Sequence, residues 1–123
     1  MANKTVLIAD DEADIVETLA FMLEAQEFNV ITANDGEAAL MKAKEERPDL
    51  ILLDVMMPKI NGYKVCRLLK FDKQYSNIPI LMLTARSQDE DRAIGEETGA
   101  DEYITKPFDI EEVVEKVKEY LNV

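Results

Sequence analysis

Acidic residues, one hydroxyl and one ammonium follow the short apolar runs of this sequence, and these are the residues whose types could do chemistry. The run "TVLIA" leads into the acids "DDE" (10–12), and the run "LILLD" ends in Asp54. Two later runs end in Thr84 and lead into Lys106. Carboxylate oxygens are hard ligands that suit Mg2+, a cation that also takes phosphate oxygens. The set therefore predicts a divalent-cation site, with Lys106 adding a fixed positive charge and Thr84 a short hydroxyl donor.

Asp54 is a single carboxylate at the end of an apolar strand, and two explanations of it are open. Strands must end somewhere, and a polar residue often marks the end. The chemical explanation requires that Asp54 meet other charged groups. Ligands of open parallel sheets bind outside the carboxyl ends of the strands, where the winding reverses. If the first and third strands are neighbours there, Asp10 and Asp11 lie beside Asp54, and three like charges in one crevice favour a bound cation.

Five short apolar runs alternate with amphipathic helical stretches and must hold these groups in place. β-Branched content and length predict strands over 5–9, 29–33, 50–54, 78–84 and 101–105. Continuously apolar strands suit a parallel sheet that is covered on both faces. The sequence therefore predicts an α/β fold, with one doubly wound, five-stranded parallel sheet and five flanking helices.

Local signals predict where the helices and turns begin. Asn61 and Asp109 are placed to cap the third and the last helix. The stretch "SQDE" (87–90) has the pattern of a capping box at the start of the fourth helix. Gly36 and Gly99 are predicted to be turn glycines. All of these residues are interpreted as structural.

Composition limits the classes of function. The 123 residues are expected to form one domain, 1–123. The 26 acidic and 14 basic residues give a net charge of −12, which would repel nucleic acid or an anionic membrane. No apolar run approaches the ~18 residues of a membrane span, and no signal-peptide pattern is present. With Cys66 as the only cysteine and no histidine, neither an internal disulfide nor a zinc site is expected. These features predict a cytoplasmic protein that contacts neither nucleic acid nor membrane directly.

Four motifs, in order, resemble the receiver domain of two-component response regulators, of the stand-alone or chemotaxis-regulator type. They are "IADDE" with its paired acids, "LLDVMMPKINGY" around Asp54, "MLTA" on the fourth strand and "DEYITKPF" on the fifth. The resemblance covers the whole chain and implies a flavodoxin-like sheet with strand order 2-1-3-4-5. One small departure is Asn61, which stands where the family usually has Asp, and both residues are good helix caps.

The resemblance implies that Asp54 is the phosphoacceptor. To attack phosphorus, its carboxylate is expected to be ionised, exposed and aimed outward. The resemblance also implies a site for Mg2+, or for Mn2+ in its place, formed by Asp10, Asp11, Asp54 and the backbone carbonyl of Met56. A bound cation would neutralise charge on the phosphoryl oxygens.

Thr84 and Lys106 are implied to contact the phosphoryl group and to complete the catalytic set with Asp54. Thr84 and Tyr103 would form a switch, because a phosphoryl group that recruits the Thr84 hydroxyl vacates space for the Tyr103 ring. The surface of the fourth helix, fifth strand and fifth helix would then change. The fourth helix, roughly residues 88–98, is poor in apolar residues and is the expected moving element. The resemblance further implies a cis peptide between Lys106 and Pro107.

The implied function is a phosphorylated signalling switch and not a conventional enzyme. The chain would take a phosphoryl group from a sensor histidine kinase and catalyse only its own phosphoryl transfer and dephosphorylation. A separate donor is expected because the sequence contains no histidine and no nucleotide-binding loop. The downstream partner would be an effector protein or domain. The receiver itself would be a monomer or a weak dimer that forms on phosphorylation.

Three other functions fit parts of the pattern. A flavodoxin-like electron carrier would share the fold, but its phosphate needs a Gly-, Ser- or Thr-rich loop where this chain has "DDE". An aspartyl phosphatase of the haloacid-dehalogenase kind would carry a second Asp where this chain has Met56. A receiver fold that acts as a scaffold without phosphorylation is the third alternative, and the complete set of site residues argues against it.

Overall fold

The computed structural model describes residues 3–85 and 99–123, and strands and helices alternate in it from the first strand to the fourth. The strands are β1 (Thr5–Ala9), β2 (Asn29–Ala33), β3 (Leu50–Asp54), β4 (Ile80–Thr84) and β5 (Glu102–Thr105). The described helices are α1 (Ala13–Ala25), α2 (Gly36–Glu46), α3 (Gly62–Lys70) and α5 (Ile110–Leu121). The predicted fourth helix and its capping box at 87–90 lie outside the described residues.

The five strands form one parallel sheet in the order β2-β1-β3-β4-β5, which confirms the predicted fold. The winding reverses after β2, so that β1 and β3 are neighbours and Ala9 pairs with Leu53. On the far side of β3, Asp54 pairs with Leu83 of β4, and Thr84 pairs with Thr105 of β5. Because all strands run in the same direction, the groups that follow β1, β3, β4 and β5 meet at one edge of the sheet.

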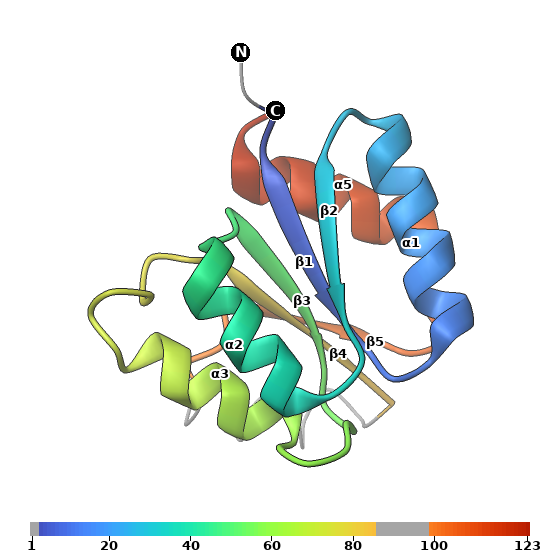
Figure 1. The fold of residues 1–123 in the computed structure, drawn as a ribbon. Helices are drawn as coiled ribbons and strands as arrows, with labels where there is room; N and C mark the ends of the chain where they lie inside the picture. Colours follow the sequence, from blue (N-terminus) through green and yellow to red (C-terminus); the bar gives the residue numbers. More distant parts are fainter. Residues whose placement is uncertain (1–2, 86–98) are drawn as a thin grey trace.

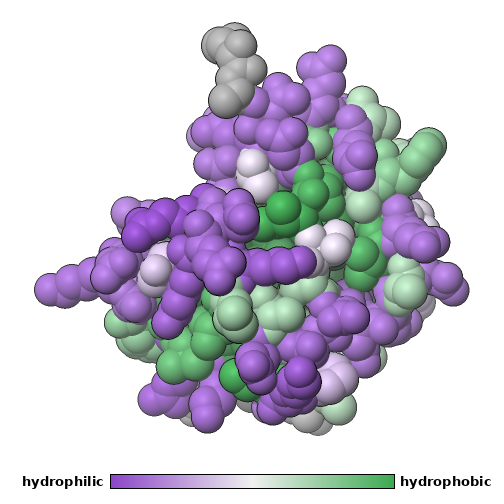
Figure 2. Space-filling model, viewed as in Figure 1, coloured by the Kyte–Doolittle hydropathy of each residue, from purple (hydrophilic) through white to green (hydrophobic). Residues whose placement is uncertain are grey.

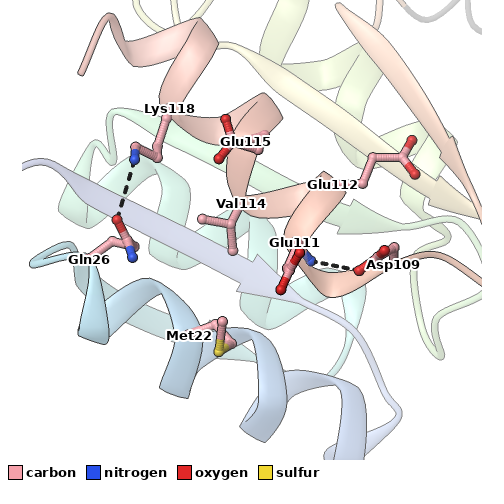
Figure 3. Close-up of a pocket in the computed structure, with 8 residues that line it drawn as sticks. All are labelled: Met22, Gln26, Asp109, Glu111, Glu112, Val114, Glu115 and Lys118. Carbon is pink, nitrogen blue, oxygen red and sulfur yellow. Dashed lines mark hydrogen bonds between the residues drawn. The ribbon is translucent and has the colours of Figure 1, made fainter.

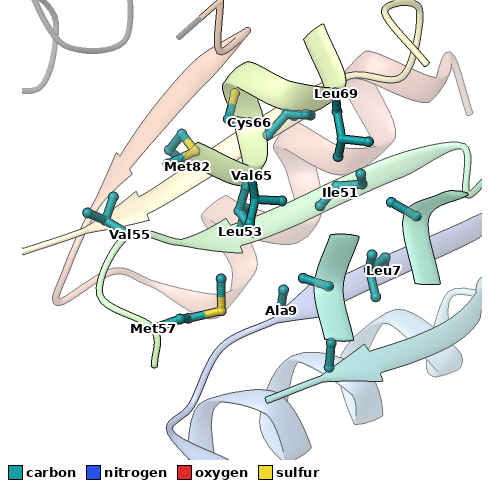
Figure 4. Packing of buried hydrophobic residues seen from close by; sticks show 14 of the residues in the cluster. Leu7, Ala9, Ile51, Leu53, Val55, Met57, Val65, Cys66, Leu69 and Met82 are labelled. Atoms are coloured by element: carbon teal, nitrogen blue, oxygen red, sulfur yellow. The ribbon is translucent and has the colours of Figure 1, made fainter. Parts of the chain in front are cut away.

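Helices cover both faces of the sheet (Figure 1). Side chains alternate between the two faces of a strand, so each strand supplies two separate cores. Leu7, Ile51 and Met82 point toward α2 and α3, where they pack in one buried cluster (Figure 4). Ile8 and Leu52 belong to a second cluster under α1 and α5. Burial on both faces explains why the central strands are apolar throughout, and it makes them a rigid support for the polar groups at their ends.

Hydrophilic side chains cover most of the outer surface seen in Figure 2, and apolar side chains gather between the helices. Among the described residues, no helix has both the length and the apolar character needed to cross a membrane.

Two strands start later than predicted, at Ile80 and Glu102 in place of 78 and 101. Pro79 has no N–H for a strand ladder. The Asp101 carboxylate accepts a hydrogen bond from the Ile80 N–H at 2.8 Å, and the Asp101 N–H donates to the Ile80 carbonyl at 3.0 Å. A side chain therefore takes the place of a ladder partner at this edge.

The predicted helix caps at Asn61 and Asp109 are confirmed. The Asn61 side chain accepts from the Lys64 N–H at 3.0 Å, and the Asp109 side chain accepts from the Glu111 N–H at 3.0 Å. The cap at Asn61 is relevant to the site, because it fixes the end of the loop that follows Asp54.

Of the two predicted turn glycines, Gly99 is confirmed and Gly36 is not. Gly99 has a φ of +80°, in the region that favours glycine. Gly36 opens α2, and glycine is required there by close approach: an added Cβ would lie 1.6 Å from the Ile60 carbonyl oxygen. At Gly62, the first residue of α3, an added Cβ would lie 2.1 Å from the Asp54 carbonyl oxygen. The loop between Asp54 and α3 is thus packed directly against two helix starts.

Candidate functional site

Asp54 ends β3 at the carboxyl edge of the sheet, and the rest of that strand is buried. The residue is only 3% exposed, so the expectation of an exposed carboxylate is wrong. Its cover comes from neighbouring polar groups: the Lys106 ammonium lies 3.3 Å from Asp54 Oδ1, and the Met56 N–H donates to the same oxygen at 3.4 Å. The carboxylate is therefore held by donors at the edge and is not immersed in the apolar core.

Lys106 joins three carboxylates from two separate parts of the chain. Its Nζ lies 3.1 Å from Asp10 Oδ2, 3.1 Å from Glu12 Oε1 and 3.3 Å from Asp54 Oδ1. The peptide bond between Lys106 and Pro107 is cis, as predicted. The Lys106 N–H donates to the Thr84 carbonyl at 2.6 Å, which ties the end of β5 to the end of β4.

Asp10 is fully buried directly after β1, and its carboxylate has two kinds of partner. Oδ2 faces the Lys106 ammonium, and Oδ1 accepts from the Glu12 N–H at 2.9 Å. The next residue, Asp11, is exposed. Carboxylate oxygens of Asp10, Asp11 and Glu12 all lie within 4.8 Å of one another. One edge of the sheet therefore concentrates negative charge around a single ammonium.

The electrostatics of the edge follow from burial and from this crowding of like charges. Burial and the nearby charge of Asp10 raise the pKa of Asp54, Lys106 opposes both, and the net result is a pKa of about 6. Burial also works against the charge of Lys106, but hydrogen bonds to Asp10 and Glu12 outweigh it and hold its pKa above the usual value. Asp54 therefore titrates closer to neutral pH than an ordinary aspartate does.

The donor set at this edge fits a hard divalent cation. Asp10, Asp11 and Asp54 offer carboxylate oxygens, and one ammonium does not balance them. Mg2+ prefers oxygen ligands and keeps several waters, so a site that is buried at Asp10 and open at Asp11 suits it. Met56, whose backbone carbonyl is predicted to take part in such a site, is exposed two residues after Asp54.

Comparison with known proteins agrees with this arrangement. Residues 6–118 match the family described as the response regulator receiver domain. The chain belongs to this family. Its members are signalling proteins of two-component systems, and their signal is phosphorylation.

Relatives of this receiver domain include regulators of gene expression. The chain is 51% identical over 119 residues to the alkaline phosphatase synthesis transcriptional regulatory protein PhoP of Bacillus subtilis, covering 97% of the chain and 49% of that protein. It is 45% identical over 115 residues to the phosphate regulon transcriptional regulatory protein PhoB of Klebsiella pneumoniae, covering 94% of the chain and 50% of that protein. The chain thus spans about half the length of these curated relatives.

Solved structures of whole receiver-sized proteins superpose on nearly all of the chain. A putative response regulator from Chloroflexus aurantiacus has a TM-score of 0.91 at 35% identity, covering 99% of this chain and 100% of that one. The chemotaxis protein CheY4 of Vibrio cholerae has a TM-score of 0.89 at 34% identity, covering 97% and 99%. The predicted likeness to chemotaxis regulators is confirmed at the level of the fold.

The two residues of the predicted switch, Thr84 and Tyr103, lie on neighbouring strands of the sheet. Thr84 is buried at the end of β4, and Tyr103 is half-buried on β5, opposite Met82 of β4 in the register. The fourth helix of the predicted output surface lies outside the described residues.

Three hollows flank α1 in the described part of the receiver. One, of about 490 Å³, lies beside the Lys106 side chain and has apolar walls that include Ile15 and Phe108. A second, of about 480 Å³, runs between α1 and α5 (Figure 3). Lys118 donates to the Gln26 side chain at 3.4 Å across one part of it. The first hollow touches the acidic edge through Glu12 and Lys106, and a third hollow, of about 430 Å³, touches it through Asp10 and Asp11.

Sequence reasoning brought together Asp10, Asp54 and Lys106, and the structure agrees. It missed the role of Glu12, which it noted only as part of "DDE". The Glu12 carboxylate contacts the same ammonium as Asp10 and Asp54. The sequence signal that could have indicated this contact is that Glu12 is the third consecutive acid after the first strand, whose end was expected to lie near Lys106.

Proposed function

We propose that this receiver domain accepts a phosphoryl group on Asp54 in a Mg2+-dependent reaction and thereby switches a partner. The observation that carries the proposal is the convergence of Asp54 with Asp10 and the Lys106 ammonium at one edge of the sheet. A rigid, fully buried strand holds the proposed nucleophile still, and a fixed cation lies within contact distance of it.

In the proposed reaction, an Asp54 carboxylate oxygen forms a bond to phosphorus while the bond from phosphorus to the donor breaks. The donor keeps the electron pair of that bond and takes up a proton from solvent. Lys106 moves a hydrogen bond from Asp54 to a phosphoryl oxygen, which offsets charge where it accumulates. Asp10, Asp11, Asp54 and the Met56 carbonyl would hold Mg2+, and the charge of the ion would help to neutralise the phosphoryl oxygens.

The donor is proposed to be the phosphohistidine of a sensor kinase, since the chain has no histidine of its own. Thr84 would contact the phosphoryl group, and its movement would admit the Tyr103 ring. The response would be a changed surface on β5, α5 and the segment between β4 and β5. Such a switch would work in the cytoplasm, as a monomer or as a weak dimer that forms on phosphorylation.

The names of the relatives support an output in transcription. Two of them are called transcriptional regulatory proteins, and both are about twice as long as this chain. We propose that the effector acts on DNA, while the receiver, with its net charge of −12, stays off the DNA itself.

The test is modification by a small phosphodonor. Acetyl phosphate with Mg2+ should add one phosphoryl group that hydroxylamine removes, and intact-mass measurement should detect it. D54N should stay unmodified, whereas D14N, the same change at an exposed residue of α1, should be modified like the wild type. Full modification of D54N would refute the assignment of Asp54 as the phosphoacceptor. No modification of the wild type would favour the scaffold alternative.

A further inference from the structure

Glu12 holds the Lys106 ammonium from the solvent side. The Glu12 side chain is 58% exposed, whereas those of Asp10 and Asp54 are 0% and 5% exposed. The ammonium thus has two contacts on its buried side, to Asp10 and Asp54, and one on its solvent side, to Glu12. The distance to Glu12 is 3.1 Å, the same as the distance to Asp10. None of the roles proposed above uses Glu12.

The backbone of Glu12 is fixed on both sides, which directs its side chain. Its N–H donates to Asp10 Oδ1, and its carbonyl accepts from the N–H groups of Ile15 and Val16 at the start of α1. Glu12 occupies the N-cap position of α1, yet its side chain makes no capping hydrogen bond within the described part of the chain. The carboxylate reaches Lys106 instead, 94 residues away in sequence.

An ammonium has three hydrogens to donate, and here they face three carboxylates. A phosphoryl group on Asp54 needs one of those donors. The contact to Asp54 is the longest, 3.3 Å, and it points at the group that would be modified. The contacts to Asp10 and Glu12 can persist while this third donor changes its acceptor.

We infer that Glu12 is a positioning residue, whose carboxylate anchors the Lys106 ammonium at the mouth of the site so that one donor is free to pass from Asp54 to a phosphoryl oxygen. The inference rests on the proposed function and deepens it. Without the outer anchor, the lysine side chain samples more conformations, and fewer of them present a donor to the phosphoryl group. Removal of Glu12 should therefore lower the maximal rate of phosphorylation and leave the half-saturating donor concentration nearly unchanged.

The experiment compares E12A and E12Q with E17Q in the full chain. Glu17 is the matched control, because it is an exposed acid on α1, the helix that follows Glu12, and it lines a hollow with Asp10 and Asp11. Among the described residues, the ion pairs of Lys106 do not include Glu17. E17Q thus reports what the loss of one negative charge does to the approach of an anionic donor.

With acetyl phosphate and saturating Mg2+, the maximal rate in E12A should fall about two- to fivefold, the range of one partly exposed ion pair. E12Q, which keeps an oxygen acceptor, should fall less, and E17Q should not fall. An unchanged rate in E12A, or an equal fall in E17Q, would overturn the inference. If the wild type itself were not phosphorylated, the proposed function would fail instead.

Two further measurements separate anchoring from other roles. In metal-free protein, the 15N resonance of the Lys106 ammonium, assigned by its loss in K106R, should shift in both Glu12 variants and stay in place in E17Q. An unmoved resonance would overturn the inference without reference to activity. Calorimetric titration with Mg2+ should give similar affinities for E12Q and E17Q. A much weaker affinity in E12Q alone would make Glu12 a metal ligand, and the inference would be wrong.

Discussion

Two lysines, at opposite edges of the sheet, are buried to nearly the same extent and have different surroundings. The Lys70 side chain is 13% exposed and that of Lys106 is 14% exposed. Lys70 donates to the carbonyls of Ser76 and Ile78 and to Asp101 Oδ2, so its ammonium meets one carboxylate and two neutral acceptors. Lys106 meets three carboxylates.

The difference lies in the charge balance and not in the number of contacts. Around Lys70, one positive and one negative charge cancel, and the same Asp101 oxygen also accepts from the Ile80 N–H. Around Lys106, negative charge is in excess, and the pKa of Asp54 is raised to about 6. Lys70 thus closes a structural junction between α3, β4 and β5, whereas the acidic edge retains capacity for another cation. In this molecule, unbalanced charge distinguishes the candidate site from an equally buried structural ion pair.

The largest expected effect separates the two lysines by activity. K106M should lower the rate of phosphorylation by acetyl phosphate with Mg2+ about 100-fold or more, because it removes a fixed charge from the developing phosphoryl charge. K70M should be phosphorylated at nearly the wild-type rate at a temperature where it stays folded. Intact-mass time courses measure both. Equal rates of phosphorylation for K106M and K70M would show that the two lysines do not differ in their contribution to the reaction.

The free energy of unfolding should depend on Lys70, the lysine that the reaction does not need. K70M leaves the Asp101 carboxylate and two carbonyls without their shared donor, so the free energy of unfolding should fall by about 2 to 3 kcal/mol. Urea denaturation followed by circular dichroism measures this change. A loss below about 0.5 kcal/mol would place Lys70 among ordinary surface ion pairs.

Neutralising one carboxylate should change the free energy of unfolding in opposite directions at the Lys70 junction and at the acidic edge. D101N should destabilise the fold, whereas D54N should stabilise it in EDTA. The folded pKa of Asp54, about 6, lies above the ordinary value of 3.8, so its protonated form favours folding. That contribution is complete below pH 3.8 and is lost as the pH rises through 6. The advantage of D54N in unfolding free energy should therefore grow by about 2 kcal/mol between pH 4.5 and pH 7.5. If the difference in unfolding free energy between D54N and the wild type did not change with pH, the raised pKa of Asp54 would not be its cause.

Mg2+ should stabilise the acidic edge and leave the Lys70 junction unaffected. At ten times its dissociation constant, Mg2+ should add about 1.4 kcal/mol to the free energy of unfolding and raise the melting temperature. The rise should be lost in D11A and kept in K70M. A melting temperature that does not respond to Mg2+ in the wild type would exclude the proposed metal site.

Features set by local sequence or by topology were predictable from the sequence. The apolar runs located all five strands, and Asn61 and Asp109 cap helices as short-range patterns predict. The meeting of Asp54 with Lys106 followed from the rule that parallel strands end at one edge. These predictions needed no knowledge of side-chain conformation.

Features that depend on side-chain conformation were not predictable. The Glu12–Lys106 contact joins residues 94 apart, and Asp101 replaces a ladder partner of β4 through its side chain. The burial of Asp54 involves the Lys106 ammonium, which comes from a strand end 52 residues away in sequence. Each depends on which of several rotamers a long or polar side chain adopts after the backbone has formed.

The two close-packed glycines bear on how a saturation-mutagenesis screen of this domain would be interpreted. An added Cβ at Gly36 would displace the Ile60 backbone, and one at Gly62 would displace the backbone of Asp54 itself. Every substitution at either position should therefore impair signalling, as substitution of Asp54 would. A map of intolerant positions would place both among the reactive residues, although neither carries a chemical group. Measuring folded protein abundance beside signalling would not separate them either, if the displaced loop alters the site while the core stays intact.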